Sequence, residues 1–137
     1  MNTSHSDAKR SPGVLSFISP HTFDDTVQRL LAAFKDHGIK VFTTIDQRAE
    51  ALAVGLSMPS TVLILFGNPK GGTPLMLANP EAGIDLPLKV LVSESQLGQV
   101  DVFINSAEYV IQRHALPNDL LANIAPVERL IAGALSA

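Results

Sequence analysis

Residues 61–76 have the sequence TVLILFGNPKGGTPLM. The first six residues form an apolar run without polar alternation, which predicts a strand in the middle of a sheet, covered on both faces. Gly67–Thr73 then forms a loop with two kinds of chain-breaking residue, glycine and proline, and with one lysine. Because Thr73 before Pro74 has the form of an N-cap, a short third helix is predicted over Pro74–Ala82.

The chain on the N-terminal side of this stretch alternates strands and helices. Val14–Ile18 is a predicted strand, and Phe23–His37 carries apolar residues at helical spacing after the cap residue Thr22. Ile39–Ile45 predicts the second strand, and Asp46 is a natural N-cap for a short second helix. The first helix is expected to pack on the central strand through these residues: Val27, Leu30, Leu31 and Phe34 on the helix, Leu63 and Leu65 on the strand.

The C-terminal side predicts a hairpin followed by helices. Leu86–Val92 and Val100–Ile104 are expected to pair as its two strands. Ser106 is expected to cap the next helix, and Asn118 is expected to cap a final helical region. Since Pro126 lies inside that region, it predicts either a kink or two helices that meet there.

These elements predict a single two-layer α+β domain with a mixed β-sheet of about five strands and helices packed mainly on one face. The domain is expected over residues 14–137, because the first 13 residues are polar, contain Ser, Pro and Gly, and predict a mobile tail. A chain of 137 residues with 46% hydrophobic content suits one compact core.

Composition excludes several classes of protein. The sequence has no cysteine, which rules out disulfides and thiol chemistry, and its net charge of -3 argues against broad nucleic-acid binding. Neither a signal core nor a run near the length of a membrane helix occurs, so a cytoplasmic protein without membrane partners is expected. The four histidines show no pair at metal-ligand spacing, so no metal and no cofactor are predicted.

Three segments carry a resemblance to a known family. They are the Ile45-Asp46 junction, the block from Phe66 to Met76 and Asp85-Leu86-Pro87-Leu88. Through them the chain, from about Val14 to Leu135, resembles Domain of Unknown Function 302, a bacterial and archaeal family of small α+β domains. The resemblance implies a fold and a candidate site but no reaction. A histidine usually follows the aspartate of the first junction in that family, whereas this chain has Gln47, so no imidazole role is implied there.

These three segments could meet along one edge of the sheet, where ligands commonly bind. Gly71 and Gly72 permit positive φ angles, and a helix N-terminus with Lys70 beside it favours an anion. The alternative is that these residues only form tight turns and that Thr73 only caps a helix. The candidate ligand-binding residues are Asp46, Gln47, Asn68, Lys70, Gly71, Gly72, Thr73 and Asp85.

The sequence therefore favours non-catalytic binding of a small anionic molecule at the Gly/Pro-rich loop. One alternative is a hydrolase or isomerase that uses Lys70 and Asp85, which requires the two side chains to meet in a closed pocket. The other is a homodimeric interaction module without a ligand. A homodimer is expected in either case, because a small sheet leaves apolar surface or an unpaired edge exposed.

Overall fold

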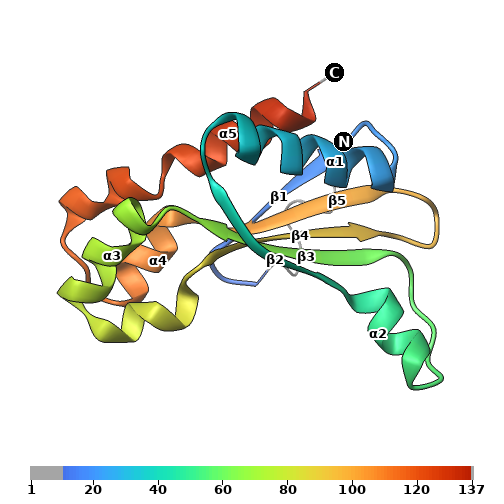
Figure 1. Cartoon of the computed structure of the whole chain (residues 1–137), viewed down its shortest axis with the longest axis horizontal. Coiled ribbons are helices and arrows are strands. Elements are labelled where there is room, and N and C mark those ends of the chain that lie inside the picture. The colour runs from blue at the N-terminus through green and yellow to red at the C-terminus, as the bar shows by residue number, and fades with distance from the viewer. Residues whose placement is uncertain (1–10, 137) are drawn as a thin grey trace.

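A computed structural model of the chain describes residues 11–136, and the expectations for residues 1–10 lie outside this range. Five strands form one sheet in the order β1-β5-β4-β3-β2 (Figure 1). The strands are β1 (Val14–Ser19), β2 (Lys40–Asp46), β3 (Thr61–Gly67), β4 (Leu88–Glu94) and β5 (Val100–Asn105). The helices are α1 (Phe23–Asp36), α2 (Gln47–Ala53), α3 (Pro69–Ala78), α4 (Ala107–Arg113) and α5 (Pro126–Leu135), with 3-10 turns η2 (Pro80–Asp85) and η3 (Asn118–Asn123).

The predicted α+β class is confirmed, but the sheet is antiparallel at every pairing rather than mixed. The connection between β3 and β4 shows the reason. Helix α3 and turn η2 lie beyond the end of β3 and do not cross back over the sheet, so the chain enters β4 where β3 stopped. Phe66 is consequently paired with Leu88. The expected hairpin of β4 and β5 is confirmed.

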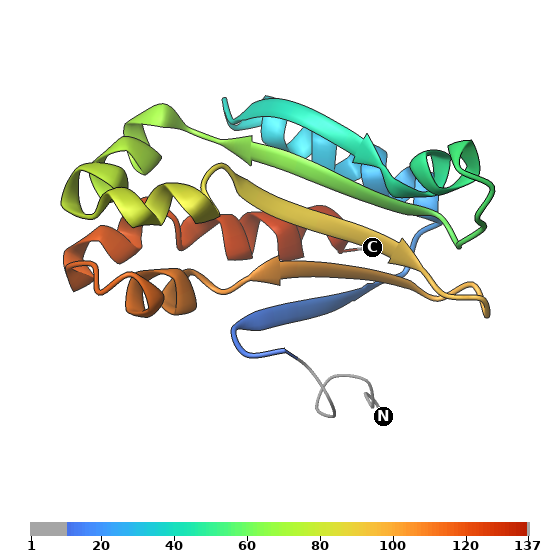
Figure 2. The same cartoon turned by 90° about the horizontal axis from the view of Figure 1, so that it is seen from below.

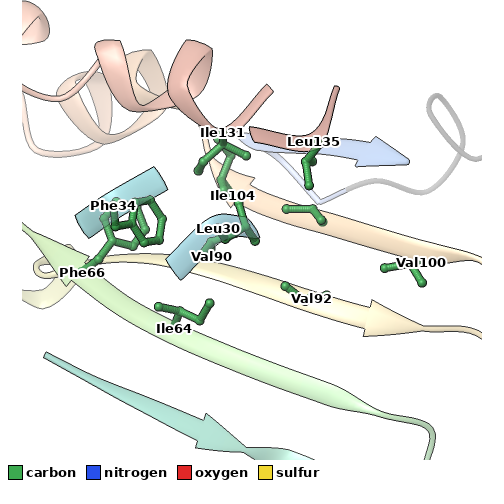
Figure 3. Close-up of a cluster of buried hydrophobic side chains, with 11 residues drawn as sticks. Leu30, Phe34, Ile64, Phe66, Val90, Val92, Val100, Ile104, Ile131 and Leu135 are labelled. Atoms are coloured by element: carbon green, nitrogen blue, oxygen red, sulfur yellow. The ribbon is translucent and has the colours of Figure 1, made fainter. Parts of the chain in front are cut away.

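Helices α1 and α5 cover one face of the sheet, as Figure 2 shows from the opposite side. The core lies between these helices and the strands, and the side chains that Figure 3 draws in it include Leu30, Phe34, Ile64, Phe66, Val90, Val92, Val100, Ile104, Ile131 and Leu135. The rings of Phe34 and Phe66 stack with their centroids 4.3 Å apart. The first helix therefore packs on β3, but through Ile64 and Phe66 instead of Leu63 and Leu65.

Two predictions for β3, that it is the middle strand and that both of its faces are covered, are wrong for related reasons. β3 lies second from one edge, and β4 is the middle strand. Side chains alternate between the two faces of a strand, and only one face of β3 lies under helices. An apolar run without alternation therefore does not by itself mean that both faces are covered by the same chain.

Several helix ends match the sequence pattern. The side chains of Thr22, Asp46 and Ser106 accept hydrogen bonds from backbone N–H groups at 3.1, 2.9 and 2.9 Å. Asn118, in contrast, is not a cap: η3 follows Pro117 and has no side-chain cap bond. The proline at position 126 separates two elements as expected, since α5 begins there. Within the described part of the chain, no helix is both long enough and apolar enough to span a membrane.

Candidate functional site

The Gly/Pro-rich segment folds differently from the sequence expectation. Helix α3 begins at Pro69 and Asn68 is its N-cap, with the Asn68 side chain accepting a bond from the Lys70 N–H at 2.9 Å. The prediction of a helix over Pro74–Ala82 with a Thr73 cap is therefore wrong. Asparagine is at least as good a cap as threonine, and Pro69 already supplies proline at the first helical position.

The backbone N–H groups of Gly71 and Gly72 are bonded within the helix, because both donate to the Asn68 carbonyl at 2.9 Å. Neither residue has a positive φ angle. A Cβ atom on Gly71 would lie 3.0 Å from the Asn123 carbonyl oxygen, so glycine lets η3 approach the helix closely. The Asn123 side chain also donates to the Gly71 carbonyl at 3.1 Å. Gly71 thus serves packing between α3 and η3, whereas Gly72 has room for a Cβ atom.

A cavity of about 930 Å³ lies beside this helix, between α3, the ends of β2 and β3, and the helices α1 and α5. Its walls are mainly apolar. The apolar lining includes Phe42, Phe66, Met76, Leu86, Pro87, Leu88, Ile124, Val127 and Leu130. The Leu86–Pro87 peptide bond in this wall is cis. Two of the three segments that carry the family resemblance, Phe66–Pro69 and Leu86–Leu88, meet at this cavity.

Few polar groups line the cavity. Asn68 and Thr73 come from the start of α3, and Asn123 comes from η3. Asp36 and His37 contribute from the end of α1, and Arg129 contributes from α5. Arg129 is exposed and forms no ion pair with any residue in the range 11–136. The His37 ring contacts the Ala33 carbonyl through Nδ1 at 2.9 Å.

Asp85 lies outside this cavity, and both oxygens of its carboxylate contact neighbouring side chains. Oδ2 is 2.6 Å from Nε2 of the buried His114, and Arg113 donates to Oδ1 and Oδ2 at 3.2 and 3.0 Å. Asn79 donates to the His114 carbonyl at 2.9 Å, which joins the two ends of η2 to the end of α4. Among residues 11–136, no cluster of three or more histidine, aspartate or glutamate side chains could hold a metal ion.

The remaining candidate residues lie apart. Lys70 is exposed and does not line the cavity, and Asp46 and Gln47 lie at the start of α2. The structure thus brings Asn68, Gly72 and Thr73 together at the cavity. Sequence analysis placed the wall from Leu86 to Leu88 near the site but missed Phe42 and Arg129. The wall segment was marked by the family resemblance, whereas nothing in the sequence around Arg129 distinguishes it from other polar residues of a helix.

A model of the family described as Domain of unknown function DUF302 matches residues 15–137. Among curated proteins, the chain is similar to "Fluoride-specific ion channel FluC 1" of Brucella suis biovar 1 (strain 1330), with 39% identity over 104 residues, 76% of this chain and 41% of that protein. The protein of the same name from Brucella abortus biovar 1 (strain 9-941) is also 39% identical over 76% of this chain and 38% of its own length. The chain therefore spans about two fifths of the length of these relatives.

Among solved structures, the chain resembles the "uncharacterized conserved protein DUF302" from Bacillus stearothermophilus. The TM-score is 0.76, and the match covers 91% of this chain and 97% of the other at 18% sequence identity. At this identity the likeness concerns the fold alone.

Proposed function

Because the chain belongs to the family described as Domain of unknown function DUF302, which has no activity in its description, we propose a function from the geometry of the cavity. The domain binds a small molecule that has an extended apolar part and an anionic group, and it does not transform that molecule. The observation that carries the proposal is the cavity of about 930 Å³ with a mainly apolar lining.

The size and lining of the cavity support the apolar part of the ligand. Binding sites for small molecules have volumes of roughly 300–1,000 Å³ and are mostly apolar, with a few polar groups that fix orientation. Phe42 and Met76 are large apolar side chains that line the cavity and remain exposed. Covering these two side chains with a ligand would remove apolar surface from water, which favours binding.

The charged groups at the cavity support the anionic part. Arg129 has a planar cation suited to a carboxylate or phosphate, and it has no acidic partner among residues 11–136. The N-terminus of α3, which the lining residue Asn68 caps, adds a partial positive charge. Among the lining residues within 11–136, Asp36 on α1 is the one acid. This assignment moves the charge role that the sequence suggested for Lys70 to Arg129.

Titration with decanoate and with decanol tests the proposal, because the two probes share an apolar chain and differ in charge. Decanoate is expected to bind more tightly, and Arg129→Gln is expected to reduce that difference several-fold. Lys70→Gln is the matched control, since Lys70 is an exposed cation outside the cavity lining. Gly72→Leu places a branched side chain in the cavity beside Leu86 and is expected to weaken binding of both probes. If the folded Gly72→Leu protein binds decanoate like the wild type, the ligand does not occupy the cavity.

A catalytic function has weaker support. The alternative with Lys70 and Asp85 requires both side chains in one pocket, and Asp85 is held by His114 and Arg113 while Lys70 is exposed. The activity named in the Brucella relatives belongs to proteins of which this chain spans about two fifths. It enters our proposal only as a choice of probe: fluoride is titrated beside decanoate, and binding of fluoride without decanoate would favour an anion site separate from the cavity. A cytoplasmic location stays a prediction.

A further inference from the structure

The face of the sheet opposite α1 and α5 has no helix across its centre, and Figure 2 views the molecule from that side. Strand register fixes which side chains share this open face. Ile45, Leu63, Leu91 and Phe103 lie opposite one another across four strands and form an apolar central row. All four side chains are only half-buried. Ile18 on β1, 48% exposed, extends the apolar surface toward the edge.

Helix α2 adds to this surface. It lies at one end of the sheet on the side away from α1 and α5 (Figure 1), and none of its seven residues is buried. The apolar side chains Leu52, Val54 and Leu56 are 53%, 72% and 64% exposed. An isolated helix of this length is marginal in water, because helices gain most of their stability from packing an apolar face. The exposed apolar side chains of α2 and the residues after it are therefore suited to contact with a partner.

The charges on the open face indicate which partner fits. Lys89 and Asp101 lie on the two sides of the central row, since Lys89 pairs with Leu65 and Asp101 pairs with Ser93. Along the strands each charge is about 7 Å from the row. Both residues are half-buried, and neither forms an ion pair with any residue of the described range 11–136. Instead, the Lys89 ammonium donates to the Pro87 carbonyl at 3.5 Å, and the Gln99 side-chain amide donates to the Asp101 carboxylate at 3.0 Å.

This pattern is complementary to itself. A two-fold axis that runs along the central row, across the strands, exchanges the two ends of the face. Lys89 of one copy then lies over the end that carries Asp101 in the other copy, and the reverse holds by symmetry. Two opposite-charge contacts would flank a shared apolar centre of leucine and phenylalanine, which is the arrangement of a core with a polar rim.

We propose that a second copy of this chain docks on the open face, so that two sheets pack face to face and α2 of each copy lies along the flank of the other. Aligned packing of two sheets at about 10 Å, which is common in proteins, leaves room for the side chains of both rows. The cavity lies under α1 and α5 on the other side of the sheet, so the dimer does not depend on the proposed ligand.

Sedimentation equilibrium of the full 137-residue chain tests the proposal with charge reversal. The wild type is expected at twice the 14.6 kDa chain mass at micromolar concentration. Lys89→Glu and Asp101→Lys each place like charges together and are expected to weaken the dimer at least tenfold. The double variant restores opposite charges and is expected to recover most of the wild-type affinity. Lys35→Glu, an exposed change on α1, is the control and is expected to have no effect.

Far-UV circular dichroism establishes that each variant is folded, and Leu52→Asp on α2 gives an independent weakening of the dimer. A monomeric wild type, or a dimer that neither charge reversal weakens, overturns the proposal. Deletion of residues 1–10 separates one rival: a dimer that forms only after this deletion means that the N-terminal segment occupies the face, which also overturns it. Failure of the double variant to recover, with both single variants weak, overturns the two-fold pairing of Lys89 with Asp101.

Discussion

The Oδ2 atom of Asp85 lies 2.6 Å from Nε2 of His114, and the two side chains are 12% and 5% exposed. Arg113, the preceding residue, donates to both oxygens of the same carboxylate. This cluster joins the end of η2 to the end of α4. Since Leu86 and Pro87 follow Asp85 directly and line the cavity, the cluster holds one wall of the candidate site in place.

Asp85→Asn is expected to lower the free energy of unfolding by about 1–3 kcal/mol, because it weakens charge-assisted hydrogen bonds and leaves His114 in a buried place with a poorer partner. Urea denaturation measures the change. Asp119→Asn is the control, as Asp119 is exposed in η3 and has no ion pair among residues 11–136. Equal costs for the two variants would show that the Asp85 cluster does not stabilise the fold.

A double-mutant cycle separates the pair from its surroundings. His114→Gln and Asp85→Asn are expected to be non-additive when combined, with a coupling of roughly 0.5–3 kcal/mol as found for residues in direct contact. Strictly additive losses would mean that the two side chains act independently despite the short distance between them.

Leu30→Ala is expected to destabilise the domain by about 2–5 kcal/mol, since Leu30 is fully buried between α1 and the sheet. Leu97→Ala, in the tight turn between β4 and β5, is expected to change stability by less than about 0.5 kcal/mol, because Leu97 is 97% exposed. Chemical denaturation of both variants checks the contrast. A loss below about 0.5 kcal/mol for Leu30→Ala would contradict the assigned core.

Most of the helices and strands could be predicted from local patterns in the sequence. The caps Thr22, Asp46 and Ser106 were recognisable because each one bonds to an N–H group a few residues away. The start of α3 was ambiguous from sequence, since Asn68-Pro69 and Thr73-Pro74 both have the form of a cap followed by proline. In the structure, Asn68 caps α3, Pro69 is its first residue, and Pro74 lies inside the helix.

The order of the strands and the buried face of β3 depend on tertiary structure. In the run from Val62 to Phe66 both alternating sets are apolar, so the sequence cannot state which set faces α1. The cavity could not be predicted from the sequence either, because its walls come from segments as far apart as Ala33 and Ala134. Only the segments around Asn68 and Pro87 were marked in advance, by the family resemblance.

The two adjacent glycines of α3 give a matched pair of substitutions. Gly72→Ala is expected to stabilise the domain by about 0.5–1 kcal/mol, because alanine is the better helix former and its Cβ atom would meet only Leu86 at 3.8 Å. Gly71→Ala is expected to lose that gain, since its Cβ atom would lie 3.0 Å from the Asn123 backbone oxygen. Thermal unfolding of both variants measures the difference. Equal stabilisation at both positions would mean that η3 does not pack closely against α3 in solution.

Ligand binding in the cavity is expected to stabilise the folded protein by mass action. At a free decanoate concentration of about 100 times its Kd, the gain is about 2.7 kcal/mol, which corresponds to a rise in Tm of roughly 5–15 °C for a domain of this size. Gly72→Leu should lose most of this rise because its side chain protrudes into the cavity, whereas Gly72→Ala, with a Cβ atom that the site accommodates, should keep it. Differential scanning calorimetry with and without decanoate gives both values. An equal rise in the alanine and leucine variants would mean that decanoate stabilises the protein from another site, and the cavity would then lose its assignment as the binding site.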